Sequence, residues 1–138
     1  MHNNQESLDS LLYDEPHGTF HDSVLVGVQV DYVAKRLVAD FDVCIGDPDA
    51  DDEKSRERRR RGRLTVEGLT VWAVELPQAT TATTQGGLWV GSVTRLAESS
   101  TGRALAGRID NSLGWVFWFN DINACAYVAG AKATFTWA

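Results

Sequence analysis

Hydrophobic and polar residues alternate with a period of two along most of this chain, as in β-strands that bury one face. From Val24 to Tyr32 an apolar side chain stands at every second position, and after a turn at 33–36 the alternation resumes from Leu37 to Ile45. These two segments predict a β-hairpin near the start of the chain.

Later segments repeat the same alternation between turn-rich stretches. Gly68 is expected to bend one of these strands and Gly130 to divide another. No helical period alternates with the strands, which disfavours a parallel sheet. Seven or eight strands in total predict a mainly β fold, either an antiparallel β-sandwich or a half-open barrel. The strands expected after the hairpin cover 63–76, 88–96, 103–110, 114–120 and 124–137.

The length of 138 residues predicts a single domain, 1–138, with an N-terminal extension over 1–19. A short helical turn is expected near Leu8 and Leu12. The segment 47–63 is predicted to be a charged helical insert, because its acids come first and its bases follow. That order places carboxylates at the positive end of a helix from Asp49 to Arg61 and guanidinium groups at the negative end.

The four arginines at the end of this block are candidates for partner binding, because guanidinium groups pair with carboxylates and phosphates. Two other interpretations of these arginines are possible. They form a solvated helix end without a partner, or they form ion pairs with the acidic body of the protein. The residues concerned are Arg58, Arg59, Arg60 and Arg61.

The net charge of the chain is −6, and segment 47–63 carries seven bases and six acids. The rest of the chain therefore carries a net charge of −7. Such a body repels phosphate backbones, so we expect no nucleic-acid partner. A basic protein is the better match, since complementary fields speed association.

His21, Asp22 and Ser23 are the residue types of a hydrolytic triad, but they are adjacent in sequence. Neighbouring side chains of an extended segment point to opposite faces, which argues against Asp22 orienting the His21 ring. Hydrogen bonding of His21 and Asp22 to backbone groups at the entry of the first strand is the first interpretation. An interfacial contact is the second and catalysis is the third.

The segment 115–119 is the largest apolar concentration in the chain. In a strand, Trp115 lies on one face with two phenylalanines, and Trp118 lies on the other face. A central strand covered on both sides explains this pattern. An aromatic face that binds a partner or a small ligand through Trp115 and Trp118 is the alternative, and Trp72, Trp89 and Trp137 would extend that face.

Cys44 and Cys125 are expected to be free thiols in a reducing cytoplasm, because two isolated cysteines make no zinc site. The sequence predicts no metal and no cofactor. The N-terminus has no signal-peptide pattern, and no run of about 18 apolar residues occurs, so we expect a cytoplasmic protein without a membrane partner.

The motif Phe20-His21-Asp22-Ser23, followed at once by the alternating hairpin to Ile45, resembles the opening of several bacterial families of small β-rich proteins. Some proteins with a similar start resemble immunity proteins of polymorphic toxin systems. The resemblance covers about 25 residues. It implies a cytosolic bacterial protein with a binding role.

Three hypotheses follow. The first is a non-enzymatic cytosolic binding protein, with an immunity-type inhibitor of a basic partner protein as its specific form. The second is a β-barrel that binds a small ligand on a tryptophan face. The third is a hydrolase that uses His21 and Asp22. We also expect a homodimer, because strand 114–120 is apolar on both faces and the arginines complement the acidic body.

Overall fold

Eight antiparallel strands form one sheet in the computed structural model, which describes residues 7–77, 86–105 and 113–138. The order across the sheet is β4-β7-β6-β5-β1-β2-β3-β8. The mainly β, antiparallel prediction is therefore confirmed. The strands are β1 (Thr19–Asp31), β2 (Arg36–Cys44), β3 (Arg59–Glu67), β4 (Val71–Val74), β5 (Leu88–Arg95), β6 (Leu113–Phe119), β7 (Ala124–Gly130) and β8 (Lys132–Trp137).

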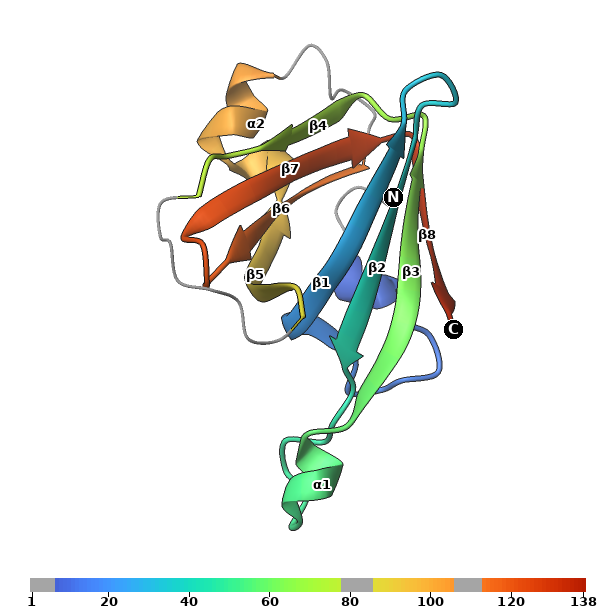
Figure 1. The fold of residues 1–138 in the computed structure, drawn as a ribbon, viewed down its shortest axis with the longest axis vertical. Helices are drawn as coiled ribbons and strands as arrows, with labels where there is room; N and C mark the ends of the chain where they lie inside the picture. Colours follow the sequence, from blue (N-terminus) through green and yellow to red (C-terminus); the bar gives the residue numbers. More distant parts are fainter. Residues whose placement is uncertain (1–6, 78–85, 106–112) are drawn as a thin grey trace.

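The sheet curls so that its two halves face each other across one aromatic core (Figure 1). Phe20 and Phe41 from one half lie 5.0 Å apart between ring centroids, and Phe41 stacks at 5.8 Å on Phe117 from the other half. The edge strands β4 and β8 do not pair with each other. Of the two predicted architectures, the molecule is thus the half-open barrel.

The predicted hairpin is confirmed as β1 and β2, with Leu37, Phe41 and Val43 buried. Two irregularities interrupt the register of β1, one between Thr19 and Val24 and one between Leu25 and Gly27. The second leaves Val26 exposed, so the predicted face of alternating valines does not stay buried along the whole strand.

The segment that was expected to be one bent strand is two strands in opposite halves of the sheet, the inner strand β3 and the edge strand β4. Gly68 separates them with a φ of 63°, a conformation that favours glycine. β3 pairs with β2 and β8, whereas β4 pairs with β7. The bend expected at Gly68 is therefore a complete crossing of the chain from one part of the sheet to another.

The predicted helix from Asp49 to Arg61 is wrong in its extent. A charged helix is inserted between β2 and β3, but α1 (Glu53–Arg56) is one turn long, capped by the Asp52 carboxylate. Arg59 already belongs to β3. Since the segment has no apolar stripe, its latter half gains more from pairing with β2 than from charge order along a helix. Figure 1 shows α1 projecting away from the barrel.

The strand predicted at 103–110 is also wrong where the structure describes it, because α2 (Ser100–Ala104) is helical and 106–112 lies outside the described residues. The Ser99 side chain accepts from the Gly102 N–H and caps this helix. With η3 (Leu96–Glu98), α2 lies on the outer face of the sheet, where buried Leu96 packs with Val116 and Ala129.

This packing confirms one interpretation of the aromatic segment. β6 lies between β5 and β7 and is covered on both faces. Trp115 and Phe117 point into the main core, and Val116 points into the smaller outer cluster.

The N-terminal segment closes part of the open barrel. Its 3-10 helix η2 (Leu8–Leu11) is capped by Ser7, and both Leu8 and Leu12 are buried in the main core. The Trp137 indole N–H donates to the Tyr13 carbonyl at 2.8 Å, which ties this segment to β8. The short helical turn predicted here is therefore confirmed as a 3-10 turn.

Candidate functional site

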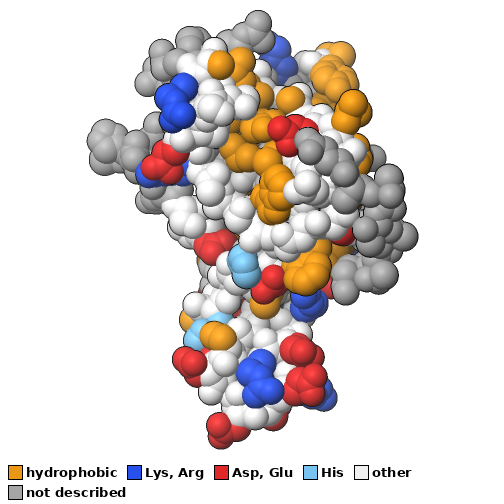
Figure 2. Space-filling view, turned by 90° about the vertical axis from the view of Figure 1, so that its left-hand side faces the viewer, with side chains coloured by type: hydrophobic (Ala, Val, Ile, Leu, Met, Phe, Trp, Pro, Cys, Tyr) orange, Lys and Arg blue, Asp and Glu red, His pale blue; other side chains and the backbone are white. Residues whose placement is uncertain are grey.

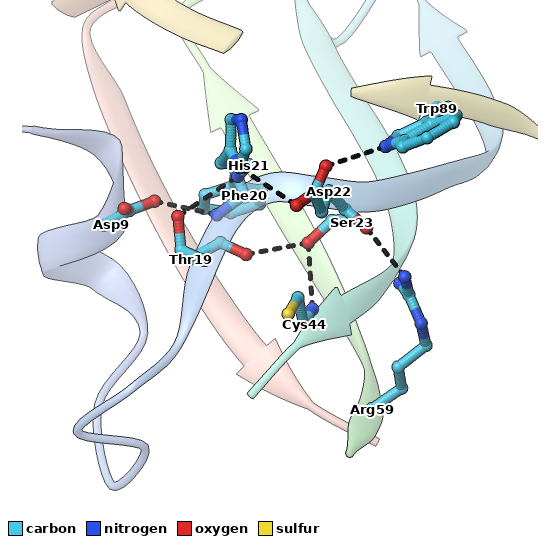
Figure 3. A network of polar contacts seen from close by, with 9 residues as sticks. All are labelled: Asp9, Thr19, Phe20, His21, Asp22, Ser23, Cys44, Arg59 and Trp89. Carbon is cyan, nitrogen blue, oxygen red and sulfur yellow. Dashed lines mark hydrogen bonds and ion pairs between the residues drawn. The ribbon is translucent and has the colours of Figure 1, made fainter. Parts of the chain in front are cut away.

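The widest irregularity of the sheet is a bulge in β1 that contains the His21-Asp22-Ser23 motif (Figure 3). Thr19 pairs with Cys44 and Val24 pairs with Asp42, so four residues of β1 stand opposite a single residue of β2. Asp22 has a φ of 67°, a left-handed conformation that aspartate tolerates better than most residues. Bulges of this kind redirect side chains at functional surfaces.

The bulge brings His21 and Asp22 together, contrary to the expectation for an extended strand. The His21 Nδ1 atom lies 3.2 Å from Asp22 Oδ2, and both side chains are about half exposed. The alternation rule fails here because the left-handed residue turns its side chain to the same side as its neighbour. Two members of a triad-like arrangement are thus in contact.

Ser23 does not complete that arrangement. Its side chain is fully buried, and its Oγ donates to the Thr19 carbonyl at 2.7 Å and accepts from the Cys44 N–H at 2.9 Å. The bond to Thr19 closes the bulge within β1, and the bond from Cys44 joins the bulge to β2. Ser23 is therefore a structural residue. The backbone contacts predicted for His21 and Asp22 are not among the side-chain contacts described for them, which join the two side chains to each other and Asp22 to the Trp89 indole.

Trp89, at the start of β5, is the large apolar side chain beside the bulge. Its indole N–H donates to Asp22 Oδ1 at 3.0 Å, and its backbone N–H lies 3.2 Å from each carboxylate oxygen of Asp121. Its carbonyl accepts from the Asn120 N–H at 3.0 Å. The side chain nevertheless stays 41% exposed. The structure therefore presents an exposed indole that Asp22 fixes at its nitrogen, on a backbone that Asp121 holds.

Arg59 supports the bulge from β3. Its guanidinium group donates to the Asp22 carbonyl at 2.8 Å and to the Asp42 carbonyl at 3.4 Å. It binds backbone oxygens and not the Asp22 carboxylate, so that carboxylate keeps its charge available at the surface. Among the four candidate arginines, Arg59 is the one that the structure brings into the site.

The other candidate arginines have other partners, and alternation along β3 turns Arg60 to the face opposite Arg59. Arg60 pairs with Glu15 at 2.8 Å, and its guanidinium carbon lies 4.7 Å from the centroid of the Trp137 ring. Arg61 lies 4.0 Å from Asp42 across the strands. Arg58 is exposed at the end of the insert, where its carbonyl accepts from the Ile45 N–H.

Among the residues that the structure describes, the tryptophans of β6 line no large cavity inside the barrel. Trp115 is 5% exposed, and the cavity that the central apolar side chains enclose has a volume of about 20 Å³, close to the size of a single water. Trp118 is half-buried on the outer face. Trp115 does line a surface pocket of about 280 Å³ between η2 and the strands β6 and β8.

A second polar cluster lies on the outer face, where Glu75 follows the edge strand β4. Its carboxylate accepts from the Cys125 N–H and from the Tyr127 hydroxyl, each at 2.8 Å. These two bonds hold the pKa of Glu75 below its usual value. Burial and the neighbouring carboxylate raise the pKa of the Cys125 thiol. The cluster extends the pairing of β4 with β7 and keeps this thiol protonated.

Cys44 and Cys125 are both free. Within the described ranges, no group of three or more histidine, cysteine or acidic side chains is placed to hold a metal ion. None of the helices in the described part of the chain is long and apolar enough to cross a membrane.

The two features that led us to expect a homodimer are satisfied within one chain. Both faces of β6 are covered, and Arg60 and Arg63 pair with Glu15 and Asp40. The homodimer stays a prediction. Sedimentation at micromolar concentration tests it, since a single species at the chain mass of 15.2 kDa would contradict it.

No model of a known protein family matches this chain. No curated protein matches it either. A solved structure described as an uncharacterized protein from Neisseria gonorrhoeae is similar with a TM-score of 0.48 and 8% sequence identity, over 86% of this chain and 93% of that one.

Proposed function

We propose that this protein is a non-enzymatic binding protein that docks a basic partner protein on the surface around Trp89. The observation that supports this best is the exposed indole of Trp89, fixed by Asp22 at its nitrogen and by Asp121 at its backbone. Tryptophan is enriched among the residues that dominate binding energy in protein interfaces. A side chain that is already fixed loses little conformational entropy on binding.

Charge supports the same proposal. The chain outside segment 47–63 has a net charge of −7, and one carboxylate lies at the Trp89 indole nitrogen and another at its backbone N–H. Figure 2 shows charged side chains of both signs on the lower projection, whereas hydrophobic side chains gather on the barrel above it. A basic partner approaching the barrel would be attracted by the net field and oriented by the local carboxylates.

Inhibition of a basic toxin in the cytoplasm, as by an immunity protein, is the specific form of this function that we propose. The early residues Phe20 to Ile45 carry the resemblance to such proteins, and the binding surface proposed here includes two of those residues, His21 and Asp22. A binding role also agrees with the burial of the Ser23 hydroxyl, whose hydrogen bonds go to the Thr19 carbonyl and the Cys44 N–H and not to His21.

Affinity capture from the source bacterium tests this function, with wild type compared against Trp89→Ala and against Leu76→Ala. Leu76 is the matched control, since it is apolar, 84% exposed and outside the site. We expect one stoichiometric partner with a basic isoelectric point, lost with Trp89→Ala and retained with Leu76→Ala. Equal recovery on all three baits, or an acidic partner, would contradict the proposal.

The surface pocket beside Trp115 favours a second function, the binding of a small ligand. Its volume of about 280 Å³ is near the lower limit of ordinary ligand pockets, and Leu11, Leu113 and Lys132 line it with Trp115. A ligand with a carboxylate and an aliphatic chain would pair with the Lys132 ammonium group and contact the apolar side chains. Titration with octanoate, followed by tryptophan fluorescence, tests this function. Saturable quenching that Lys132→Met abolishes would support it, and a linear response would exclude it.

A further inference from the structure

We infer that the exposed Trp89 indole, with the Asp22 carboxylate at its nitrogen and the Asp121 carboxylate at the Trp89 backbone N–H, binds an arginine side chain of the basic partner. This inference rests on the proposed function and names the chemistry of its central contact. A guanidinium group is attracted to the face of an indole and pairs at the same time with carboxylates at its edges. The Trp89 side chain is 41% exposed, the Asp22 carboxylate lies at its indole nitrogen, and the Asp121 carboxylate lies at its backbone N–H.

The protein itself contains an occupied example of this arrangement. The Arg60 guanidinium carbon lies 4.7 Å from the centroid of the Trp137 ring, and Arg60 Nη1 lies 2.8 Å from Glu15 Oε2. The Trp137 indole N–H is fixed by a carbonyl, as the Trp89 indole N–H is fixed by Asp22. In the part of the chain that the structure describes, Arg60 is the cation placed over a tryptophan ring, and Trp89 has no such occupant.

The carboxylates at Trp89 retain the capacity to bind a guanidinium group. An ionised carboxylate has about four acceptor positions, of which Asp22 uses one for Trp89 and one towards His21. The Asp22 side chain is 47% exposed. Arg59, the nearest described arginine, donates to the backbone carbonyls of Asp22 and Asp42. An incoming arginine would therefore meet accessible acceptors beside the ring.

Arginine fits this surface better than lysine. Its planar guanidinium group stacks on an aromatic face while its N–H groups point outward in the plane toward acceptors. A lysine ammonium is a compact and strongly hydrated charge, which would lose hydration over the ring without gaining a planar contact.

Two-dimensional NMR of the full-length 15N-labelled protein tests this inference with N-acetyl-argininamide as the probe. N-acetyl-citrullinamide has the same shape without the charge and is the control ligand. The Trp89 indole resonance is identified by its loss in Trp89→Phe. We expect the arginine probe to shift this resonance in a saturable manner, and the citrulline probe to bind at least roughly fivefold more weakly.

Charge variants distinguish binding by the carboxylates beside Trp89 from a general attraction to the negatively charged protein. Asp22→Asn and Asp121→Asn should each weaken the arginine probe roughly two- to fivefold, and asparagine tolerates the left-handed backbone of position 22. Asp51→Asn removes the same charge at an exposed position of the insert and should leave the affinity unchanged. Their backbone spectra establish that each variant is folded.

Three results would overturn the inference: no shift of the Trp89 resonance, equal affinity for the two probes, or equal weakening by Asp51→Asn. The proposed function can be distinguished from it. If capture of a basic partner depends on Trp89 while the arginine probe does not bind, the partner uses another contact and only this inference fails. If the probe binds but no basic partner is captured, the arginine site stands without the proposed function.

Discussion

Replacing Ser23 with alanine should destabilise the whole protein, although the change removes a single oxygen atom. The Ser23 Oγ lies in a fully buried side chain and makes two hydrogen bonds, to the Thr19 carbonyl at 2.7 Å and from the Cys44 N–H at 2.9 Å. The bond to Thr19 closes the bulge within β1, and the bond from Cys44 joins it to β2. The substitution would leave one donor and one acceptor without a partner at the base of the hairpin.

The expected magnitude follows from those two groups. Leaving a buried backbone polar group unsatisfied costs about 1–3 kcal/mol, and partial access of water to Cys44 reduces the cost there. We therefore expect Ser23→Ala to lower the free energy of unfolding by about 2–3 kcal/mol. At this chain length the midpoint of thermal unfolding should fall by about 8 °C.

Urea unfolding monitored by tryptophan fluorescence measures this change. Ser92→Ala is the matched control, because Ser92 is exposed on the neighbouring strand β5. The control should stay within about 0.5 kcal/mol of wild type. If both variants lose the same small amount, the bulge is not joined to β2 through Ser23 and our account of its geometry is wrong.

Three further predictions concern other parts of the fold. Gly62→Ala should lower the free energy of unfolding by about 1–3 kcal/mol in a urea titration, since a Cβ there would lie 2.3 Å from the Phe135 ring; a neutral effect would contradict this packing. Arg60→Met should speed hydrogen exchange at 8–15, because it unpairs the mostly buried Glu15 carboxylate, whereas Arg58→Met should not. Folding lowers the pKa of Glu75, so its ionised carboxylate stabilises the folded protein. This stabilisation is present above the pKa of Glu75 in the unfolded chain and is lost as pH falls through its pKa in the folded protein. Glu75→Gln should therefore flatten stability between about pH 5 and 3, and an unchanged pH profile would refute the assigned bonds.

Period-two alternation predicted the hairpin and most of the later strands because burial of one sheet face imposes it directly on the sequence. Val43 and Leu64 are buried for this reason. The charged block was misread because charge order is a local preference, worth a few tenths of a kcal/mol per pair. Pairing with β2 outweighs it. Arg60, Gly62 and Leu64 stand at alternate positions and lie on the inward face of β3. This period of two was the sequence signal for a strand, and the helix prediction overlooked it.

The candidate site was less accessible to sequence reasoning. Contact between His21 and Asp22 depends on a left-handed backbone in a four-residue bulge, and no local pattern in the sequence marks its position. Trp89 was recognised only as one of several tryptophans, and Asp121 was not considered. Their proximity to Asp22 arises from the pairing of β5 with β1 and from the β6–β7 turn, which are long-range contacts.

The affinity of the captured partner for wild type and for Trp89→Ala, measured by isothermal titration calorimetry at low and high salt, tests the central claim most directly. We predict that Trp89→Ala weakens binding by at least about 2 kcal/mol, roughly thirtyfold, as expected for a dominant interface residue. Wild-type affinity should also fall as salt rises, because the complementary charges are screened. Equal affinities of the two proteins for a basic partner would contradict the account, even if that partner binds tightly.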